Sequence, residues 1–274
     1  MKKDKFLRLL VPSVPILSRS PLASILDIAD SYIKKGRKEW SELPPASMRL
    51  RTGVGNRILR NHQQFIDSGN NIVPELSAKG YLKPESKVLE IGCGCGRNVP
   101  SFSRFLSSHG SYTGIDVDNQ MIEWCDNHLR SSNIHFYFAD VYSKVYNPKG
   151  KETAGYSFPL GDSSTDLIIS LSLFSHLLYA DFCRYISEGA RVLRKGGYFH
   201  LTVFLIDYLK KRLGDRWTFA HKLDRCYVEN VKYPEAAVAY DLDIVKEVLL
   251  ANNLSLIEIY NDQVHQQSLI AQKK

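Results

Sequence analysis

The chain has 274 residues, of which 44% are hydrophobic and 24% charged, and these proportions are typical of an ordinary globular protein. The length suits one large domain or one domain with additions. The five cysteines are an odd number and predict no disulfide framework, so a reducing, cytoplasmic location is the simpler expectation.

Positive charge is concentrated at the N-terminus. The formal net charge is +7, and residues 1–40 hold nine lysines and arginines against four acidic residues. The rest of the chain is close to balanced, which argues against a nucleic-acid surface over the main domain. We therefore expect no nucleic-acid partner.

Residues 1–40 form a basic arm that is rich in apolar residues. Its apolar run 6–17 is interrupted by an arginine and two prolines and is shorter than the about 20 residues that span a bilayer, so neither a signal peptide nor a transmembrane helix is predicted. Residues 24–33 have the spacing of a short amphipathic helix. Two interpretations stay open. Either the arm packs on its own domain, or it makes a peripheral contact with a membrane surface, which basic and apolar residues together favour.

Residues 41–80 are predicted to form a helical cap region, which a double proline separates from the arm. Arg49 and Arg51 alternate with Leu50, so an extended backbone would point both arginines the same way. They belong either to a solvated face or to the lining of a pocket for an anionic substrate. A helix is expected from about residue 58 to residue 66.

From residue 81 onward, segments with the two-residue period of strands alternate with segments that have the period of helices. This predicts a Rossmann-like, doubly wound α/β domain over residues 81–274, with a mostly parallel seven-stranded sheet, helices on both faces and the N-terminal helical extension. The expected strands are 88–91, 111–117, 134–138, 167–171, 198–205, 254–260 and 268–271. Helices are expected from about residue 97 and over 119–129, 181–193 and 241–252.

Residues 206–238 depart from this alternation, with three consecutive basic residues and several aromatic ones. Ligands of such folds bind outside the carboxyl ends of the strands. We expect the segment to be an insertion over the mouth of that crevice.

The first strand leads into a turn with three glycines, Gly92, Gly94 and Gly96. Glycine suits a ligand-binding turn because it tolerates positive φ and lets a ligand approach the backbone. The dinucleotide frame G-x-G-x-x-G does not fit, since its sixth position is Arg97 counted from Gly92 and Val99 counted from Gly94. The chain shows the pattern E-x-G-x-G-x-G.

Five motifs, in order, resemble those of the class I S-adenosylmethionine-dependent methyltransferases. They are EIGCGCG at 90–96, GIDV at 114–117, ADV at 139–141, DLIISL at 166–171 and RVLRKGG at 191–197. One such motif is weak evidence, whereas five at the expected spacings are specific, and the resemblance runs from about residue 87 to residue 260. It implies S-adenosyl-L-methionine as the cofactor and methyl transfer as the activity.

The resemblance also implies roles for individual residues. Asp116 and Val117 close the second strand, where an ionised carboxylate accepts hydrogen bonds from both ribose hydroxyls. Met121 packs against the adenine face or is a plain core methionine. Asp140 accepts from the adenine amino group, and the Val141 amide contacts a ring nitrogen. The other cofactor-binding residues are expected at the glycine turn and at the end of the fourth strand, and they are Glu90, Gly92, Cys93, Gly94, Gly96 and Leu171.

His176 follows the fourth strand, at the carboxyl edge of the sheet where the methyl group would lie. As a general base it would activate a hydroxyl near neutral pH. The alternative is a structural histidine that caps the next helix or lines the pocket. Cys93 and Cys95 form a lone C-x-C without a second pair at zinc spacing, so no metal site is predicted.

Two motifs are missing after the fourth strand, and their absence narrows the class of molecule that could accept the methyl group. These are the Asn/Asp-Pro-Pro-aromatic motif of amino-methylating nucleic-acid enzymes and the Pro-Cys nucleophile of cytosine C5 enzymes. Short patterns at 44–55 and 234–241 resemble bacterial methyltransferases that serve glycan or secondary-metabolite modification, which favours a small-molecule or saccharide hydroxyl. The alternatives are a cofactor-binding partner module without catalysis, a methyltransferase for protein or nucleic acid, and a Rossmann dehydrogenase. The sequence does not indicate the oligomeric state.

Overall fold

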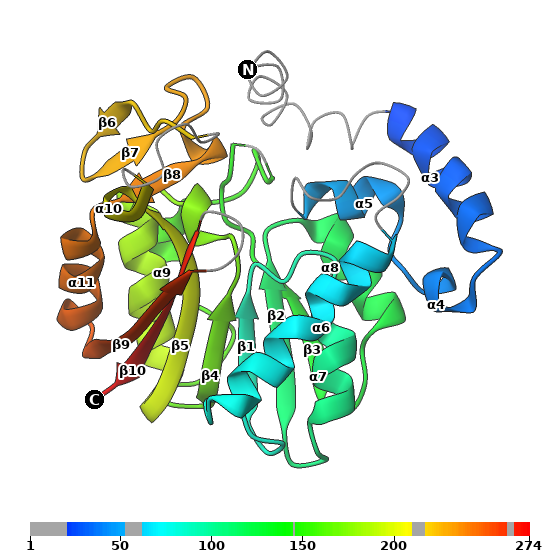
Figure 1. The fold of residues 1–274 in the computed structure, drawn as a ribbon, viewed down its shortest axis with the longest axis horizontal. Helices are drawn as coiled ribbons and strands as arrows, with labels where there is room; N and C mark the ends of the chain where they lie inside the picture. Colours follow the sequence, from blue (N-terminus) through cyan, green and yellow to red (C-terminus); the bar gives the residue numbers. More distant parts are fainter. Residues whose placement is uncertain (1–20, 53–61, 145, 210–216, 262–265) are drawn as a thin grey trace. The chain divides into compact units, whose positions relative to one another are not determined.

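The computed structural model describes residues 21–52, 62–144, 146–209, 217–261 and 266–274. The chain divides into two compact units, residues 1–85 with 93–138 and residues 86–92 with 139–274. Figure 1 shows the elements coloured along the chain. The expected helix start near residue 58 and the first half of the basic arm lie outside the described residues.

The first unit contains a parallel pair of strands, β2 (Ser111–Asp116) and β3 (Ile134–Phe138). The last residue of β2, Asp116, lies opposite the last residue of β3, so the carboxyl ends of both strands meet at one edge. α8 (Asn119–His128) connects the two strands and packs on both. Its buried residues recur at helical spacing, which is why this segment forms an amphipathic helix.

The described residues of the first unit form five further helices. They are α3 (Pro21–Lys34), α4 (Lys38–Ser41), α5 (Ala46–Arg51), α6 (His62–Ala78) and α7 (Val99–Phe105). α3 packs against α4 and α5, and α6 packs against α7. The extended backbone considered for Arg49 and Arg51 is wrong, because both lie in α5. Side chains two residues apart on a helix diverge, so the two arginines reach different partners.

The second unit is built on three parallel strands, β1 (Lys87–Ile91), β4 (Thr165–Ser170) and β5 (Leu193–Leu205). All three have long buried apolar runs, as expected of strands covered on both faces. A C-terminal hairpin extends the sheet, with β10 (Gln267–Lys273) antiparallel to β5 and β9 (Leu254–Asn261) antiparallel to β10. α9 (Tyr179–Val192) packs on β5, and α11 (Leu242–Ala251) packs on β9 and α9.

β5 begins five residues before the expected strand start at residue 198. Leu193 already pairs with Thr165, and the ladder resumes at Leu167 opposite Tyr198, with a register shift in between. The residues 194–197 are taken up by that irregularity, where Gly196 has a φ of 78°. The double glycine therefore lies in a bulge within β5, and α9 ends before it, at Val192.

The segment 206–238 has its own small ladder. Its described elements and the strand that follows are α10 (Ile206–Leu209), β6 (His221–Leu223), β7 (Cys226–Val228), η4 (Pro234–Ala236) and β8 (Val238–Tyr240). β7 pairs antiparallel with both β6 and β8, and β8 pairs parallel with the end of β5. A cluster centred on Phe204, Phe219 and Ala239 is the core beneath this ladder. It remains a prediction that the segment covers a ligand crevice.

The predicted α/β class is confirmed, with parallel central strands in both units. The strands β1 to β5, β9 and β10 match the seven that the sequence predicts, whereas β6, β7 and β8 are additional short strands. Within the described ranges, none of the helices combines the length and the apolar character that crossing a membrane requires.

Candidate functional site

The glycine turn is connected to β2 in the first unit. The Cys93 N–H donates to the Ile115 carbonyl at 3.1 Å. Gly94 and Gly96 have φ values of 55° and 72°, in the left-handed region that side chains with a Cβ disfavour. A Cβ on Gly96 would lie 2.4 Å from a methyl carbon of Leu129, so both conformation and space require glycine there.

Asp116 is held by two backbone donors. Its Oδ2 accepts the Gly94 N–H at 2.7 Å, and its Oδ1 accepts the Asp118 N–H at 2.8 Å. The residue as a whole is half-buried. Each carboxylate oxygen can accept two hydrogen bonds, which leaves capacity for one further donor on each. Two ribose hydroxyls fit this capacity.

Burial also changes the acidity of this carboxyl. It raises the pKa of Asp116 to about 6, although the N–H groups of Asp118 and Gly94 favour the ionised form. A raised pKa is common at ligand-binding carboxylates, because a buried negative charge is unfavourable as long as no ligand is bound to it. Above about pH 6 the group is an anion that accepts hydrogen bonds only.

α5 packs directly over the glycine turn, which the sequence did not indicate. Arg51 is buried, and its Nη1 donates to Asp118 Oδ2 at 2.7 Å. A Cβ on Gly94 would lie 3.0 Å from the methyl carbon of Thr52, the residue after α5. Arg51 therefore lines neither a solvated face nor an open anion pocket, but anchors the residue whose N–H binds Asp116.

α6 approaches the same turn from another direction. A Cβ on Gly69 would lie 2.1 Å from the carbonyl oxygen of Arg97, so only glycine allows α6 to come this close to the backbone of the turn. An isolated glycine within a helical pattern is the one signal in the sequence that could have indicated this contact.

Met121 and the two cysteines of the turn are buried in the first unit. Met121 forms an apolar cluster with Cys95 and Phe65, and its sulfur would lie 3.7 Å from a Cβ on Gly94. Burial raises the pKa of the Cys95 thiol to about 12, so it stays protonated and inert. Among the described residues no group of three or more His, Cys, Asp and Glu side chains is placed to hold a metal ion.

In the second unit, β1 and β4 end side by side. Glu90 is buried on β1 opposite Ile169, and the Ser170 hydroxyl donates to the Ile91 carbonyl at 3.0 Å. Gly92 follows β1 with a φ of 78°, and a Cβ there would lie 3.3 Å from Leu173. The end of β1 is thus in contact with the loop that carries the residues after Leu171.

That loop contains a strained residue. Ser172 has a φ of 60°, which is uncommon for a residue other than glycine. Its N–H donates to the Thr202 hydroxyl at 2.7 Å, which holds the conformation in place. Backbone strain of this kind clusters at functional sites.

Asp140 and Val141 are engaged in local contacts. The Asp140 carboxylate lies 3.2 Å from the ammonium of Lys151, an exposed residue. The Val141 N–H donates to the Ala139 carbonyl at 2.7 Å. An adenine contact at these positions requires Asp140 to keep an accepting oxygen free and Val141 to share its N–H.

His176 ends the short helix η3 (Phe174–His176), six residues after β4. Its Nδ1 lies 2.8 Å from the backbone carbonyl oxygen of Glu235 in η4. A carbonyl only accepts, so Nδ1 carries the proton and Nε2 keeps its lone pair. Burial lowers the pKa of His176, against the opposing effect of this hydrogen bond, so the ring is neutral at pH 7.

Glu235 is fixed at the same time by its side chain. Its carboxylate accepts the Lys144 N–H at 3.0 Å and the Ser143 hydroxyl at 3.2 Å. Burial raises the pKa of this carboxyl. Residues 143–144 therefore hold η4, and η4 in turn sets the orientation of the His176 ring. Nothing in the local sequence pattern indicates this contact across 59 positions.

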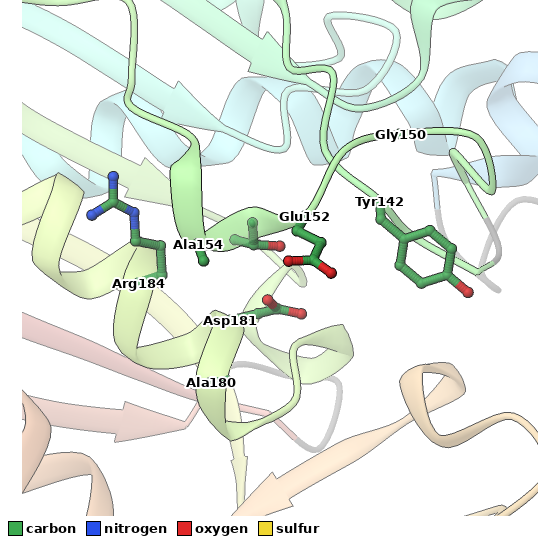
Figure 2. Close-up of a pocket in the computed structure, with 8 residues that line it drawn as sticks. Tyr142, Gly150, Glu152, Ala154, Ala180, Asp181 and Arg184 are labelled. Carbon is green, nitrogen blue, oxygen red and sulfur yellow. The ribbon is translucent and has the colours of Figure 1, made fainter.

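A pocket of about 500 Å³ lies between the loop after β3 and the start of α9. Figure 2 shows the carboxylates of Glu152 and Asp181 close together within it. The guanidinium of Arg184 is bound to the Tyr156 carbonyl. The remaining lining residues are Tyr142, Gly150, Thr153, Ala154 and Ala180. This lining combines charged groups with apolar surface.

Within each unit the structure brings several predicted residues together. Gly94, Asp116 and Met121 form one group in the first unit, and Gly92 contacts the loop before His176 in the second. The carboxylate at 116 has the capacity to accept the two hydroxyls of a nucleoside ribose. These features fit an S-adenosyl cofactor.

Comparisons with known proteins agree with this interpretation. Residues 89–201 match a family model described as a methyltransferase domain. A phthiotriol/phenolphthiotriol dimycocerosates methyltransferase of Mycobacterium tuberculosis is 32% identical over 41% of the chain and 36% of its own length. A fatty-acid O-methyltransferase of Mycolicibacterium smegmatis is 29% identical over 42% of the chain and 36% of its own length. The chain thus spans about a third of the length of these curated relatives.

Solved structures show the same fold. The PH0226 protein of Pyrococcus horikoshii OT3 has a TM-score of 0.56 at 17% identity, over 78% of this chain and 92% of that one. A SAM-dependent methyltransferase from Aquifex aeolicus has a TM-score of 0.50 at 19% identity, over 77% and 92%. At such identities the likeness concerns the fold alone. The five ordered motifs and the match over residues 89–201 identify a class I S-adenosylmethionine-dependent methyltransferase domain in this chain, a domain type whose cofactor is S-adenosyl-L-methionine.

Proposed function

We propose that this protein methylates an oxygen atom of a small, lipid-like molecule with S-adenosylmethionine as methyl donor. The lipid class rests on the names of the two mycobacterial relatives above, of which one is a fatty-acid O-methyltransferase. The oxygen acceptor rests on His176, a neutral imidazole whose Nε2 has no hydrogen-bond partner among the residues that the structure describes. A saccharide hydroxyl, which short sequence patterns favour, is the competing acceptor within the same reaction class.

The residues expected to contact the cofactor would have separate roles. Asp116 would accept both ribose hydroxyls, and Met121 would contact the adenine face. Asp140 and Val141 would bind the adenine edge. Glu90 would orient the methionyl end, and the glycine turn would let the cofactor approach the backbone. When bound, the cofactor supplies an electrophilic methyl group on a positively charged sulfonium.

The single observation that carries the acceptor side is the hydrogen bond from His176 Nδ1 to the Glu235 carbonyl. It fixes the tautomer with Nε2 unprotonated, and the lowered pKa keeps the ring neutral at pH 7. Such a ring can take the proton of a hydroxyl at Nε2 as the oxygen becomes a nucleophile. A carboxylate acceptor would not need the base, so the dependence on His176 separates the two oxygen classes.

The test is an acceptor screen with S-adenosylmethionine. The panel contains a long-chain fatty acid, a long-chain alcohol, an alkylphenol and a neutral saccharide, and product is detected as S-adenosylhomocysteine and as the methylated acceptor by mass spectrometry. We expect turnover on an alcohol or a phenol, and a loss of about 10²- to 10⁴-fold in kcat for His176→Ala, the usual contribution of a general base.

Each other result has a defined meaning. Turnover on the saccharide alone would identify a saccharide, and not a lipid-like molecule, as the class of acceptor. Methylation of the fatty acid with no effect of His176→Ala would exclude His176 as a general base. Tight binding of S-adenosylhomocysteine without turnover on any acceptor would favour a non-catalytic, cofactor-binding module.

A further inference from the structure

Helix α3 turns its charged side chains inward. The Asp27 carboxylate accepts the Ser47 N–H at 2.8 Å and the Ser47 hydroxyl at 2.7 Å, both on α5. Asp30 is buried, and its two oxygens accept from the guanidinium of Arg49 at 2.7 and 3.1 Å. These are the two carboxylates of α3, so α5 fixes which side of α3 faces the protein.

The opposite side of α3 is apolar and exposed. Ile25, Ile28 and Tyr32 are 63%, 59% and 67% exposed, and we call these three residues the outer face of α3. Their spacing of three and four residues places them on one stripe of the helix. A surface helix of a globular protein normally buries its apolar stripe and exposes its charges. α3 does the reverse, so its outer face is expected to meet an apolar phase.

Basic side chains flank the outer face. Lys35, Arg37 and Lys38 are exposed just after α3, and the ammonium of Lys35 lies 4.8 Å from the centre of the Tyr32 ring. The exposed acids of that segment are Glu39, which pairs with Arg37, and Glu42. In the sequence, residues 1–40 carry nine basic and four acidic residues. The exposed side chains that follow α3 thus hold three basic groups against two acidic ones, an excess of one positive charge that favours an anionic surface.

We propose that the outer face of α3 docks on an anionic lipid bilayer. A helix that lies in the plane of a membrane inserts its apolar stripe at the headgroup boundary and places lysines and arginines beside the phosphates. Tyrosine is favoured at this depth because its ring is apolar and its hydroxyl polar. The outer face of α3 is an apolar stripe on one helix with basic side chains beside it, and these features fit the surface of an anionic bilayer.

The experiment is co-sedimentation of the full chain with large vesicles, without cofactor or acceptor. One set contains phosphatidylcholine alone, and the other contains phosphatidylcholine mixed with phosphatidylglycerol. We expect binding to the second set that weakens as salt rises. Ile25→Ser with Ile28→Ser should lower the partition coefficient about tenfold or more, because two apolar side chains that would be buried in the bilayer are lost. Lys35→Glu with Arg37→Glu should lower it by roughly tenfold or more.

Leu250→Ser is the matched control, since Leu250 is 72% exposed on α11 in the other unit. It should leave the partition coefficient unchanged. Retained S-adenosylhomocysteine binding and an unchanged circular dichroism spectrum would show that each variant is folded.

Several results would overturn the proposal. They are no binding of the full chain to anionic vesicles, equal binding by the double isoleucine variant, and binding that depends on residues 1–20 but not on the outer face. A dimer in light scattering that Ile25→Ser with Ile28→Ser dissociates, without any vesicle binding, would assign the outer face to a second copy of the chain. The proposal does not depend on the proposed methyl transfer, because no acceptor or turnover enters the assay.

Discussion

The Nδ1 atom of His176 lies 2.8 Å from the backbone carbonyl oxygen of Glu235, and this contact joins two segments that are 59 positions apart. It leaves Nε2 as the accepting nitrogen of a neutral ring. Since the partner is a backbone carbonyl, substitution of Glu235 does not remove it. The contact depends instead on the position of η4, which the Glu235 carboxylate fixes through Ser143 and Lys144.

The first prediction concerns the pH dependence of kcat. Only neutral His176 accepts a proton, and its pKa is lowered from 6.5 by burial, so kcat should be constant at pH 7–8 and fall only below pH 6.5. His176→Asn should abolish this acid limb and lower kcat. The rates are measured with an acceptor from the screen at saturating cofactor, so that protonation of Asp116 does not enter.

His109→Ala is the control for the His176 variants, because His109 is an exposed histidine in the first unit. It should leave the profile unchanged. An acid limb in the His176→Asn variant with the same midpoint as in the original protein would show that another group titrates.

The second prediction concerns cofactor affinity. Asp116→Asn removes the charge and one accepting oxygen, so the affinity for S-adenosylhomocysteine should fall roughly 100-fold or more, as expected for two hydrogen bonds to a charged group. For the original protein, affinity should rise with pH up to about 6 and then level off, because only the ionised carboxylate accepts both hydroxyls. Titration calorimetry at several pH values measures both effects.

Ionisation of Asp116 should have the opposite effect on folding stability: cofactor affinity rises with pH, whereas the contribution of Asp116 to stability falls. The pKa of Asp116 in the folded chain is about 6, above its ordinary value of 3.8, so the folded state holds the proton more tightly than the unfolded state. Its contribution to stability is complete below pH 3.8 and is lost as the pH rises through 6. Asp116→Asn should lose this pH dependence and lower the stability, because the amide keeps only one oxygen to accept the N–H groups of Gly94 and Asp118. Unchanged affinity in a folded Asp116→Asn protein would exclude the ribose contact.

The sequence predicted those parts of the fold that depend on local pattern. The buried strands β1, β4 and β5 have continuous apolar runs, and the glycine turn has a fixed spacing, so both could be recognised without a structure. Asp116 was recognised from its place at the end of β2, and the structure adds how Gly94 and Asp118 hold it. Its role as a ribose ligand stays a prediction until cofactor binding is measured.

Contacts between distant segments could not be predicted from one sequence. Arg51 and Asp118 are 67 positions apart, and nothing in the local pattern of either indicates that they pair. The basic pattern at 49–51 favoured a solvated or anion-binding segment because an arginine is rarely buried without a partner. The outer face of α3 was likewise hidden, because the spacing of isoleucines shows that a helix has an apolar side but not which way that side faces.

The third prediction tests the ion pair over the glycine turn. Arg51→Met leaves the buried Asp118 carboxylate without its cation, and breaking a buried pair in this way costs about 3–5 kcal/mol in the free energy of unfolding. Arg51→Met with Asp118→Asn should recover part of this loss. Denaturant unfolding measures both variants.

Arg130→Met is the control for that series. Arg130, two residues after the end of α8, pairs with Asp126 on that helix, but the two side chains are 46% and 35% exposed, and such solvent-accessible pairs contribute about 0–1 kcal/mol. Equal losses for Arg51→Met and Arg130→Met would contradict the buried pair.

The fourth prediction tests the close approach of α6 to the turn. Gly69→Ala places a Cβ 2.1 Å from the Arg97 carbonyl oxygen, which belongs to the backbone and cannot move aside without shifting the turn. Overpacking of this kind costs about 1–3 kcal/mol, more than the roughly 1 kcal/mol that alanine gains over glycine within a helix. The melting temperature should fall, and S-adenosylhomocysteine should bind more weakly because the turn is displaced. Gly155→Ala has open space around its Cβ and should change neither quantity, so a melting temperature that Gly69→Ala leaves equal or higher would show that α6 does not rest on the turn.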